Sequence, residues 1–370
     1  MSTDPTRPLT GVRILDCSRL LPCSFGTQLL ADLGAEVIKV EQVGGEIGRQ
    51  HDRFPTVNRH KLSVTLDLGS EVGRQRLHRL LDTADVLLES FRPGVMERFG
   101  LGYEDLRERY PSLIYVSSSG YSSESPTPRR PGHDLNYLAS AGVIQPRVTD
   151  RPVLSATPVG DLATGMITAL ATLAALVHVQ NTGEGQHVAT AMADVSLALG
   201  AVGAGRLPPE PNDVGRELRT WPDVPLGNFP CYGSYETSDR RFVTLGNIEE
   251  KFWREFLTIT GLTELADKQF ATGEDAEVAE STIAKVMASR TLAEWEEVFA
   301  DRDVCFAPVM TLREAVRSPD STERHLVEVD ENDLLFATFP AEFSGTPTRS
   351  GGLPPEPGQH NELFFGPDRD

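Results

Sequence analysis

Residues 11–41 read GVRILDCSRLLPCSFGTQLLADLGAEVIKVE, and this stretch decides the fold. Residues 11–16 are typical of a short buried strand, and residues 35–41 predict a second one. Between them, residues 24–34 carry apolar side chains at helical spacing and end in Gly34, a plausible C-cap. A strand, a helix and a strand in this order predict a parallel, right-handed unit.

The same alternation continues through the first 120 residues. Further strands are predicted at 62–68, 84–89 and 113–119, and helices at 70–83 and 105–110. This pattern is typical of an α/β, Rossmann-like sheet. No GxGxxG follows the first strand and no GxxxxGK[ST] occurs, so we do not expect NAD or ATP bound in the common way.

The later part of the chain predicts a second, smaller domain. Leu162 to Val179 is an apolar run of eighteen residues, but it contains three threonines, a glycine and a histidine, so we expect a buried helix rather than a membrane span. Helical pattern resumes at 187–205. A hairpin is predicted at 231–247, and helices at 250–260, 277–289 and 292–300. The predicted division of the chain is a large domain at 1–205, a proline-rich linker at 206–230, a small domain at 231–325 and a return segment at 326–370.

The composition of the chain limits the classes of partner that we expect it to bind. A net charge of −19 argues against nucleic acid or an anionic membrane as the main partner, although local basic clusters can still bind an anionic small molecule. The four cysteines match no zinc pattern and the N-terminus has no signal-peptide core. We therefore expect a cytoplasmic protein without a metal site.

Individual residues leave several interpretations open. His133, in the stretch GHDLNY at 132–137, could be an ordinary loop histidine, and Asp161 could simply be the N-cap of the apolar helix. Cys305 fits a buried structural cysteine. Six basic residues follow predicted strand ends, where they could bind phosphates or face solvent. They are Lys39, Arg49, Arg53, Arg59, Lys61 and Arg92.

Seven stretches in order resemble one family. They include LADLGAEVIKVE at 30–41, NRHKLSVTLDL at 58–68, ADVLLESFRPGVMERFGLGY at 84–103 and GHDLNYLASAG at 132–142. The others are GEGQHVATAM at 183–192, GNIEEKFW at 246–253 and CFAPVMTLREAV at 305–316, with a weaker echo in LPPEPGQHNE. Together they resemble the class III coenzyme A transferase superfamily, which includes the α-methylacyl-CoA racemases. The resemblance implies a large Rossmann-like domain, a smaller α+β domain and an interlocked homodimer.

Within that family, the residues of GHDLNY indicate the racemase branch. The resemblance implies that His133 and Asp161 are two catalytic bases, that Glu249 partners His133, and that an acyl-CoA thioester is inverted at its α-carbon. Inversion needs a proton removed from one face and one delivered to the other, through an enolate that needs hydrogen-bond donors. We expect backbone N–H groups at the start of the Asp161 helix to supply them. No cofactor is implied, since CoA is part of the substrate. The residues implied to contact CoA or substrate are Lys39, Asn58, Arg59, Lys61, Leu87, Glu89, Arg92, Gly120, Tyr121, Gly132, Asp134 and Tyr137.

Two other functions stay open on the sequence. In the transferase branch, an aspartate matching Asp161 attacks the thioester and forms an acyl-enzyme anhydride, and the residue matching His133 is usually not histidine. A CoA-thioester binder without catalysis is the third possibility. It is kept open by residues 121–125, YSSES, where the family has a glycine-rich loop.

Overall fold

Six parallel strands form the sheet of the larger part of the chain. The computed structural model describes residues 7–144, 154–204, 229–349 and 351–367. The strand order is β3-β2-β1-β4-β5-β6, and the five strand pairs are all parallel. The strands are β1 (Arg13–Cys17), β2 (Glu36–Glu41), β3 (Leu62–Thr65), β4 (Val86–Glu89), β5 (Ile114–Ser119) and β6 (His187–Ala191). The order reverses between β1 and β4, which is the place where open α/β sheets bind ligands.

The prediction of an α/β sheet is confirmed, with one element missed. Residues 187–191 were predicted as the start of a helix, but they form β6, and the helix α8 begins only at Met192 and runs to Ala204. β6 pairs with β5 from Tyr115↔His187 to Ser119↔Ala191. Tertiary pairing with β5 therefore overrides the helical pattern of these five residues.

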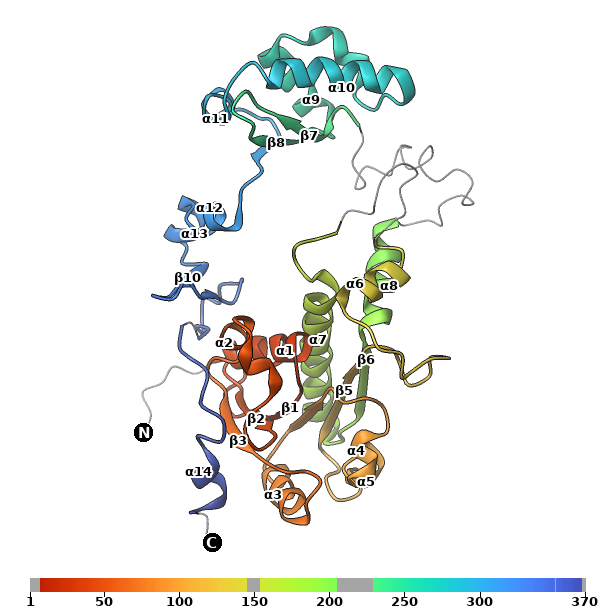
Figure 1. Ribbon diagram of the computed structural model, residues 1–370, viewed down its shortest axis with the longest axis vertical. Coiled ribbons are helices and arrows are strands. Elements are labelled where there is room, and N and C mark those ends of the chain that lie inside the picture. The colour runs from red at the N-terminus through yellow and green to blue at the C-terminus, as the bar shows by residue number, and fades with distance from the viewer. Residues whose placement is uncertain (1–6, 145–153, 205–228, 350, 368–370) are drawn as a thin grey trace. The chain divides into compact units, whose positions relative to one another are not determined.

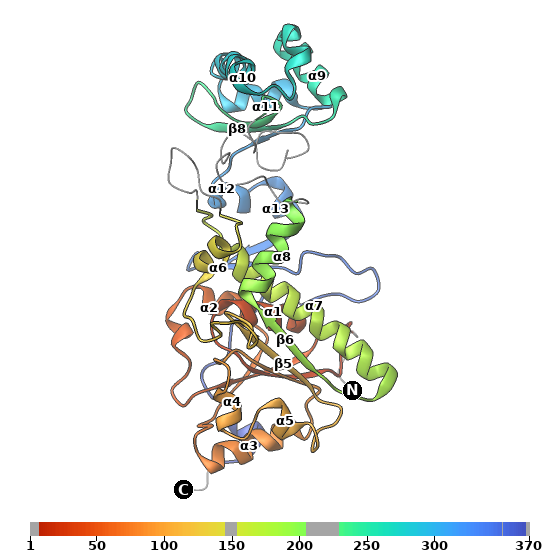
Figure 2. The same cartoon turned by 90° about the vertical axis from the view of Figure 1, so that its right-hand side faces the viewer.

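Helices cover both faces of the sheet (Figure 1 and Figure 2). On one face, β-strand residues such as Ile14 and Val116 pack with α1 (Leu21–Asp32) and α7 (Val159–Thr182). On the other, residues such as Leu87 and Tyr115 pack with α3 (Glu71–Leu81), α4 (Val95–Arg98) and α5 (Tyr103–Leu106). Burial on both faces explains why the central strands are almost continuously apolar.

Helices α1 and α7 touch through glycines. A Cβ atom on Gly26 would lie 2.7 Å from the carbonyl oxygen of Gly165, and one on Gly165 would lie 2.5 Å from the carbonyl oxygen of Pro22. Both distances are shorter than real Cβ contacts, so only glycine allows the two backbones to approach this closely. The contact lies about one helical turn after Asp161, and it holds the start of α7 against the start of α1.

Helix α7 is only half-buried, which corrects the prediction of a buried helix. Its packed face is made of small side chains, including Gly165, Thr168 and Thr172. Several of its large apolar side chains face outward, with Met166 50% and Leu170 62% exposed. Among the described residues, this is the one helix whose length and apolarity would also suffice to cross a membrane, a test that core helices of soluble proteins pass as well.

A second compact unit is formed by the described residues between Ala201 and Ser318. The predicted hairpin is confirmed as β7 (Tyr232–Glu236) and β8 (Phe242–Gly246), and β9 (Phe306–Pro308) adds a third antiparallel strand. Three helices pack on it: α9 (Glu250–Thr260), α10 (Gly273–Met287) and α11 (Leu292–Phe299). Trp253, Phe256 and Trp295 form the centre of this core. Most of the predicted linker lies outside the described residues.

The chain belongs to the sheet unit again from Pro319 onward. This segment contains α13 (Pro319–Glu323), β10 (Val327–Val329), β11 (Leu335–Ala337) and α14 (Asn361–Phe365). Its end caps the edge strand β3, because Ser63 N–H donates to His360 Nδ1 and Thr65 N–H donates to Asn361 Oδ1, at 3.0 and 2.9 Å. An otherwise open strand edge is thereby covered.

Candidate active site

His133 and Asp161 line one cavity of about 510 Å³ in the sheet unit. Residues after β1 and β2 form much of its wall, as expected for a ligand site at the carboxyl ends of parallel strands. One of them, Leu20, has a φ of 65°, a conformation that is rare for a non-glycine residue and common at functional sites. The lining consists of Leu20, Leu21, Ser24, Glu46, Gly48, His51, Asp52, Arg53, Phe54, Val57, Asn58, His133 and Asp161.

The stretch GHDLNY is held by its own hydrogen bonds. His133 is the N-cap of α6 (Asp134–Ser140), and its backbone N–H donates to Asn136 Oδ1 at 3.0 Å. The Tyr137 hydroxyl donates to the carbonyl oxygen of Gly132 at 2.9 Å. These bonds fix the backbone on both sides of His133 and leave its side chain exposed toward the cavity.

Asp161 is not the N-cap of α7, which corrects the prediction. The helix begins at Val159 with Pro158 as its N-cap, so Asp161 lies inside the first turn. The capping carboxylate comes instead from Asp134, whose Oδ1 accepts the backbone N–H of Asp161 at 2.9 Å. The Asp161 carboxylate is thereby left facing the cavity.

Burial raises the pKa of Asp161 to about 6, and the neighbouring Asp134 carboxylate adds to this effect. The charges of His133 and Arg53 act in the opposite direction without cancelling it. Asp161 can therefore hold or release a proton near neutral pH, as a general acid or base requires.

The predicted donors for an enolate at the start of α7 are partly engaged. The Asp161 N–H binds Asp134, and the Leu162 N–H binds the carbonyl oxygen of Pro158 at 3.1 Å. Of the first turn, this leaves the N–H groups of Val159 and Gly160 without a hydrogen bond among the described residues. The role of this turn in binding an enolate stays a prediction.

Three basic residues predicted to contact CoA lie inside the protein. Lys39 pairs with Glu46 at 3.1 Å, Arg59 with Asp32 at 2.5 Å and Lys61 with Asp16 at 3.0 Å. Each of the three is at most 3% exposed, and Leu87 is a fully buried core residue. Their contact with CoA stays a prediction, and this arrangement does not favour it.

Lys61 instead supports the wall of the cavity. Its ammonium group donates to Asn58 Oδ1 at 2.8 Å and to the carbonyl oxygen of Ser24 at 3.0 Å, and both of these residues line the cavity. Burial lowers the pKa of Lys61 to about 8, although Asp16 opposes this. Burial disfavours the ionised form of Asp16, but Lys39 and Lys61 outweigh it and hold its pKa below the usual range.

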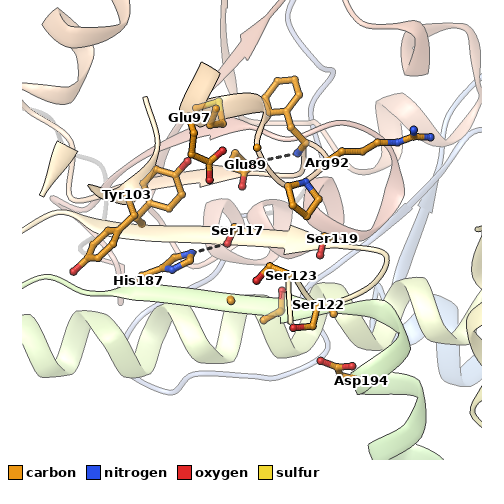
Figure 3. A pocket seen from close by; sticks show the side chains of 18 residues that line it. Glu89, Arg92, Glu97, Tyr103, Ser117, Ser119, Ser122, Ser123, His187 and Asp194 are labelled. Atoms are coloured by element: carbon orange, nitrogen blue, oxygen red, sulfur yellow. Dashed lines mark hydrogen bonds between the residues drawn. The ribbon is translucent and has the colours of Figure 1, made fainter. Parts of the chain in front are cut away.

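Glu89 and Arg92, also predicted to bind CoA, line a second, smaller cavity of about 120 Å³ (Figure 3). Figure 3 shows Ser117 and His187 on the side of the cavity opposite Glu89 and Glu97. A hydrogen bond of 2.7 Å joins Ser117 Oγ and His187 Nε2. Burial raises the pKa of Glu89 to about 8, with a further contribution from Glu97, while the Phe91 N–H opposes the shift. The carboxyl group of Glu89 is thus largely neutral at pH 7.

The predicted pantetheine region is tightly packed around Tyr137. A Cβ atom on Gly120 would lie 2.3 Å from the Tyr137 hydroxyl, so any larger residue here would displace the Tyr137 ring. The rings of Tyr121 and Tyr137 meet edge to face, with centroids 5.3 Å apart. Both tyrosines are buried here, and their contact with substrate stays a prediction.

Glu249 lies in the other compact unit, at the N-cap of α9. Its side chain is exposed. Its predicted partnership with His133 stays a prediction.

The sequence pattern of CoA-transferase family III matches residues 9–361. The chain belongs to this family. It is 33% identical, over 98% of its length and 99% of the relative, to "Probable fatty acyl-CoA transferase Rv3272" of Mycobacterium tuberculosis. It is also 31% identical to the α-methylacyl-CoA racemase of Homo sapiens, over 95% of this chain and 91% of the relative. The family thus contains both of the activities considered above.

Solved structures of family members have the same fold. The crystal structure of Rv3272 from M. tuberculosis superposes with a TM-score of 0.83 at 32% identity, covering 98% of this chain and 100% of that one. The sheet and the motifs of this chain are therefore those of CoA-transferase family III. Sequence reasoning missed two features of the site. One is the hydrogen bond from the Asp161 N–H to Asp134. The other is that Arg53 has no ion-pair partner among the described residues, whereas Lys39, Arg49, Arg59 and Lys61 each have one.

Proposed function

We propose that this protein is an epimerase that inverts the α-carbon of a 2-methyl-branched or otherwise 2-substituted acyl-CoA. The observation that carries the proposal is that His133 and Asp161, 28 residues apart in sequence, line the same cavity. The raised pKa of Asp161 supports it, because a carboxyl group that titrates near 6 can accept and return a proton in the working range of a histidine.

The proposed reaction moves two protons and keeps the charge balanced. One of the two groups, deprotonated, removes the proton from the α-carbon, and the electron pair of the C–H bond moves onto the thioester oxygen to give an enolate. The other group, protonated, delivers its proton to the opposite face of the carbon. After one turnover the two groups have exchanged protonation states, so the same site catalyses the reverse reaction.

Exchange of the α-proton in D₂O tests the proposal. With a purified 2-methylacyl-CoA, the wild-type protein should incorporate deuterium at the α-carbon, and His133→Ala and Asp161→Asn should each lose it. His178→Ala, which removes an exposed histidine on α7, is the matched control. If exchange survives in both site variants, the two-base mechanism is wrong.

A second candidate is CoA transfer between two carboxylic acids, with Asp161 as nucleophile. It is favoured by the relatives that are named transferases, including the succinyl-CoA:mesaconate CoA-transferase of Haloarcula marismortui at 31% identity, and by the open position of Asp161 on the cavity. This function predicts an acyl-enzyme that hydroxylamine traps and that still forms in His133→Ala. Epimerisation predicts no such adduct.

Acyl-CoA binding is implied by the family, and we place the CoA portion near the second cavity. The exposed Arg92 can contact phosphates there, and a largely neutral Glu89 does not repel them.

The family's homodimer is part of the same proposal. It is supported by the outward apolar side chains of α7 and α8, such as Leu170 and Val202, which are 62% and 84% exposed. Sedimentation equilibrium of the full chain measures this state directly.

A further inference from the structure

Helix α1 begins without a side-chain cap and with unpaired N–H groups. The residue before it, Leu20, has φ 65° and ψ −175°, a region that only glycine enters readily. In other helices, such as α3, the N–H of the fourth residue donates to the carbonyl oxygen of the N-cap residue. No such bond joins Ser24 to Leu20, and the N–H groups of Leu21 and Cys23 likewise have no hydrogen bond among the described residues. The start of α1 therefore offers unpaired donors to a ligand.

The side chain of Ser24 is unpaired as well. Ser24 is only 1% exposed, and its Oγ atom has no hydrogen-bond partner among the described residues. In α7, by contrast, the hydroxyl groups of Thr164 and Thr172 donate to the carbonyl oxygen four residues earlier, at 2.7 and 2.8 Å. A buried hydroxyl group without a partner costs free energy, which a ligand that pairs with it would restore.

These groups lie at the cavity of the two proposed bases. Leu20, Leu21 and Ser24 line it together with His133 and Asp161. The unpaired N–H groups at the start of α7 belong to two residues that are absent from this lining. The rare backbone conformation of Leu20 fits such a place, because strained residues cluster at functional sites.

The donors and the charges of the cavity together show which ligand atom fits. Donors at the positive end of a helix suit an oxygen that carries negative charge. Glu46 is paired with Lys39 at 3.1 Å, and the neighbouring Asp52 and Arg53 are exposed and opposite in charge. Asp161 is therefore the carboxylate that decides whether an anion is tolerated here. The charged and titratable side chains of the lining are Glu46, His51, Asp52, Arg53, His133 and Asp161.

The proposed reaction leaves Asp161 without a charge at the moment when an anion forms. Before the reaction, one of the two bases holds a transferable proton. Once the α-proton has been removed, both of them do, so Asp161 is neutral and His133 is positively charged while the thioester oxygen carries the negative charge. A transient enolate therefore meets no ionised Asp161, whereas a permanently charged group at the same place would.

We infer that the start of α1 and the hydroxyl group of Ser24 bind the thioester oxygen of the acyl-CoA and stabilise the negative charge that this oxygen gains in the enolate. The inference rests on the proposed function, since the oxygen gains this charge only when the α-proton leaves. Ser24 donates a hydrogen bond and transfers no proton, so its effect grows with the charge on the oxygen. Lys61 holds the backbone of this turn in place, because its ammonium group donates to the carbonyl oxygen of Ser24 at 3.0 Å.

Ser24→Ala tests the inference through rate and stability. It should lower kcat for α-proton exchange by about a hundredfold to a thousandfold, the effect of losing one donor to an oxyanion, with little change in KM. It should not lower Tm, because the hydroxyl group that it removes has no partner in the protein. Ser196→Ala is the matched control. Ser196 is also fully buried and without a partner among the described residues, but it lies on α8 and is absent from the cavity lining, so kcat should stay unchanged. A wild-type kcat in Ser24→Ala overturns the inference.

The carbonyl stretch of a bound thioester decides the inference without turnover. Pivaloyl-CoA has no α-proton to exchange, and a ¹³C label at its thioester carbonyl separates its infrared band from those of the protein. A hydrogen bond to the carbonyl oxygen lowers the stretching frequency, so the band should lie lower in wild-type protein and in Ser196→Ala than in Ser24→Ala. The same frequency in all three proteins overturns the inference whatever the rates are, because the hydroxyl group then does not touch the oxygen. A frequency difference without exchange on any 2-methylacyl-CoA supports the oxygen site and counts against the proposed function alone.

Discussion

The Oδ1 atom of Asp134 lies 2.9 Å from the backbone nitrogen of Asp161 and accepts its hydrogen bond. The bond joins the GHDLNY stretch to the first turn of α7, 27 residues further along the chain. It fixes the position of the second proposed base relative to the first. It also places one carboxylate beside another, which raises the pKa of Asp161 beyond the effect of burial.

Replacing Asp134 by asparagine should separate these two effects. Asparagine keeps an oxygen that can accept the Asp161 N–H but removes the charge, so the pKa of Asp161 should fall toward its ordinary value. When Asp161 acts as the base, the rate of α-proton exchange rises with pH as Asp161 loses its proton. This rising part of the pH profile should then move to lower pH. Asp134→Ala should also lose the acceptor and lower the maximal rate. An unchanged limb in Asp134→Asn would show that burial alone sets this pKa.

Asp161 should also affect stability in a pH-dependent way. Its pKa is raised from 3.8 to about 6 in the folded protein, so the folded state binds this proton more tightly than the unfolded state. The contribution of this carboxyl group to the stability of the wild-type protein is therefore fully present below pH 3.8, and it is lost as the pH rises through 6. Asp161→Asn should melt at a higher temperature than wild type at pH 7, with the difference disappearing near pH 4. A difference that is constant between pH 4 and 7 would contradict the shift.

The glycine contact between α1 and α7 should tolerate no methyl group. In Gly165→Ala the new Cβ would lie 2.5 Å from the carbonyl oxygen of Pro22, which is backbone and cannot rotate away. We expect a loss of about 1–3 kcal/mol in the free energy of unfolding, as for other overpacked sites. Gly203→Ala on α8 is the control, because its added methyl meets nothing within 4 Å and alanine favours helix. Urea denaturation of both variants gives the comparison, and equal stabilities would disprove the close contact.

The buried pair of Lys61 and Asp16 should be costly to break. Lys61→Met leaves Asp16 as an unpaired charge in the core, which should cost about 3–5 kcal/mol. Adding Asp16→Asn should recover much of this loss. Lys251→Met, which breaks the exposed pair with Asp303, should cost less than about 1 kcal/mol. A double variant no more stable than Lys61→Met would mean that the cost lies in packing rather than in charge.

The sequence predicted the parts of the fold that depend on local pattern. Alternating apolar segments located the first five strands of the sheet, but the pairing of residues 187–191 with β5 is non-local, so β6 was missed. The apolar run at 162–179 correctly indicated a helix. It could not indicate that the small side chains, such as Thr168, would form the packed face while Leu170 stays outside.

The site was predictable only in part, because its contacts are also non-local in sequence. His133 and Asp161 were paired by the family resemblance, since nothing in their spacing brings them together. Asp161 was interpreted as its own helix's cap because a cap from Asp134 requires knowledge of the tertiary contact. The basic residues from 39 to 61 looked alike in sequence, and the structure separates Arg53 from four others through their ion pairs.

Glu89 supplies a pH test of where CoA binds. Its carboxyl group has a pKa of about 8, raised first by burial and then by Glu97, so it is largely neutral at pH 7 and gains a charge as pH rises through 8. If phosphates lie beside Arg92 in the same cavity, that new charge should repel them. The affinity of wild-type protein for CoA should therefore fall between pH 7 and 9, while Glu89→Gln, which stays neutral, should fall less. Glu108→Gln, an exposed change, should follow wild type. Calorimetric titration of CoA across this range measures the effect, and identical pH dependence in all three proteins would place the phosphates away from Glu89.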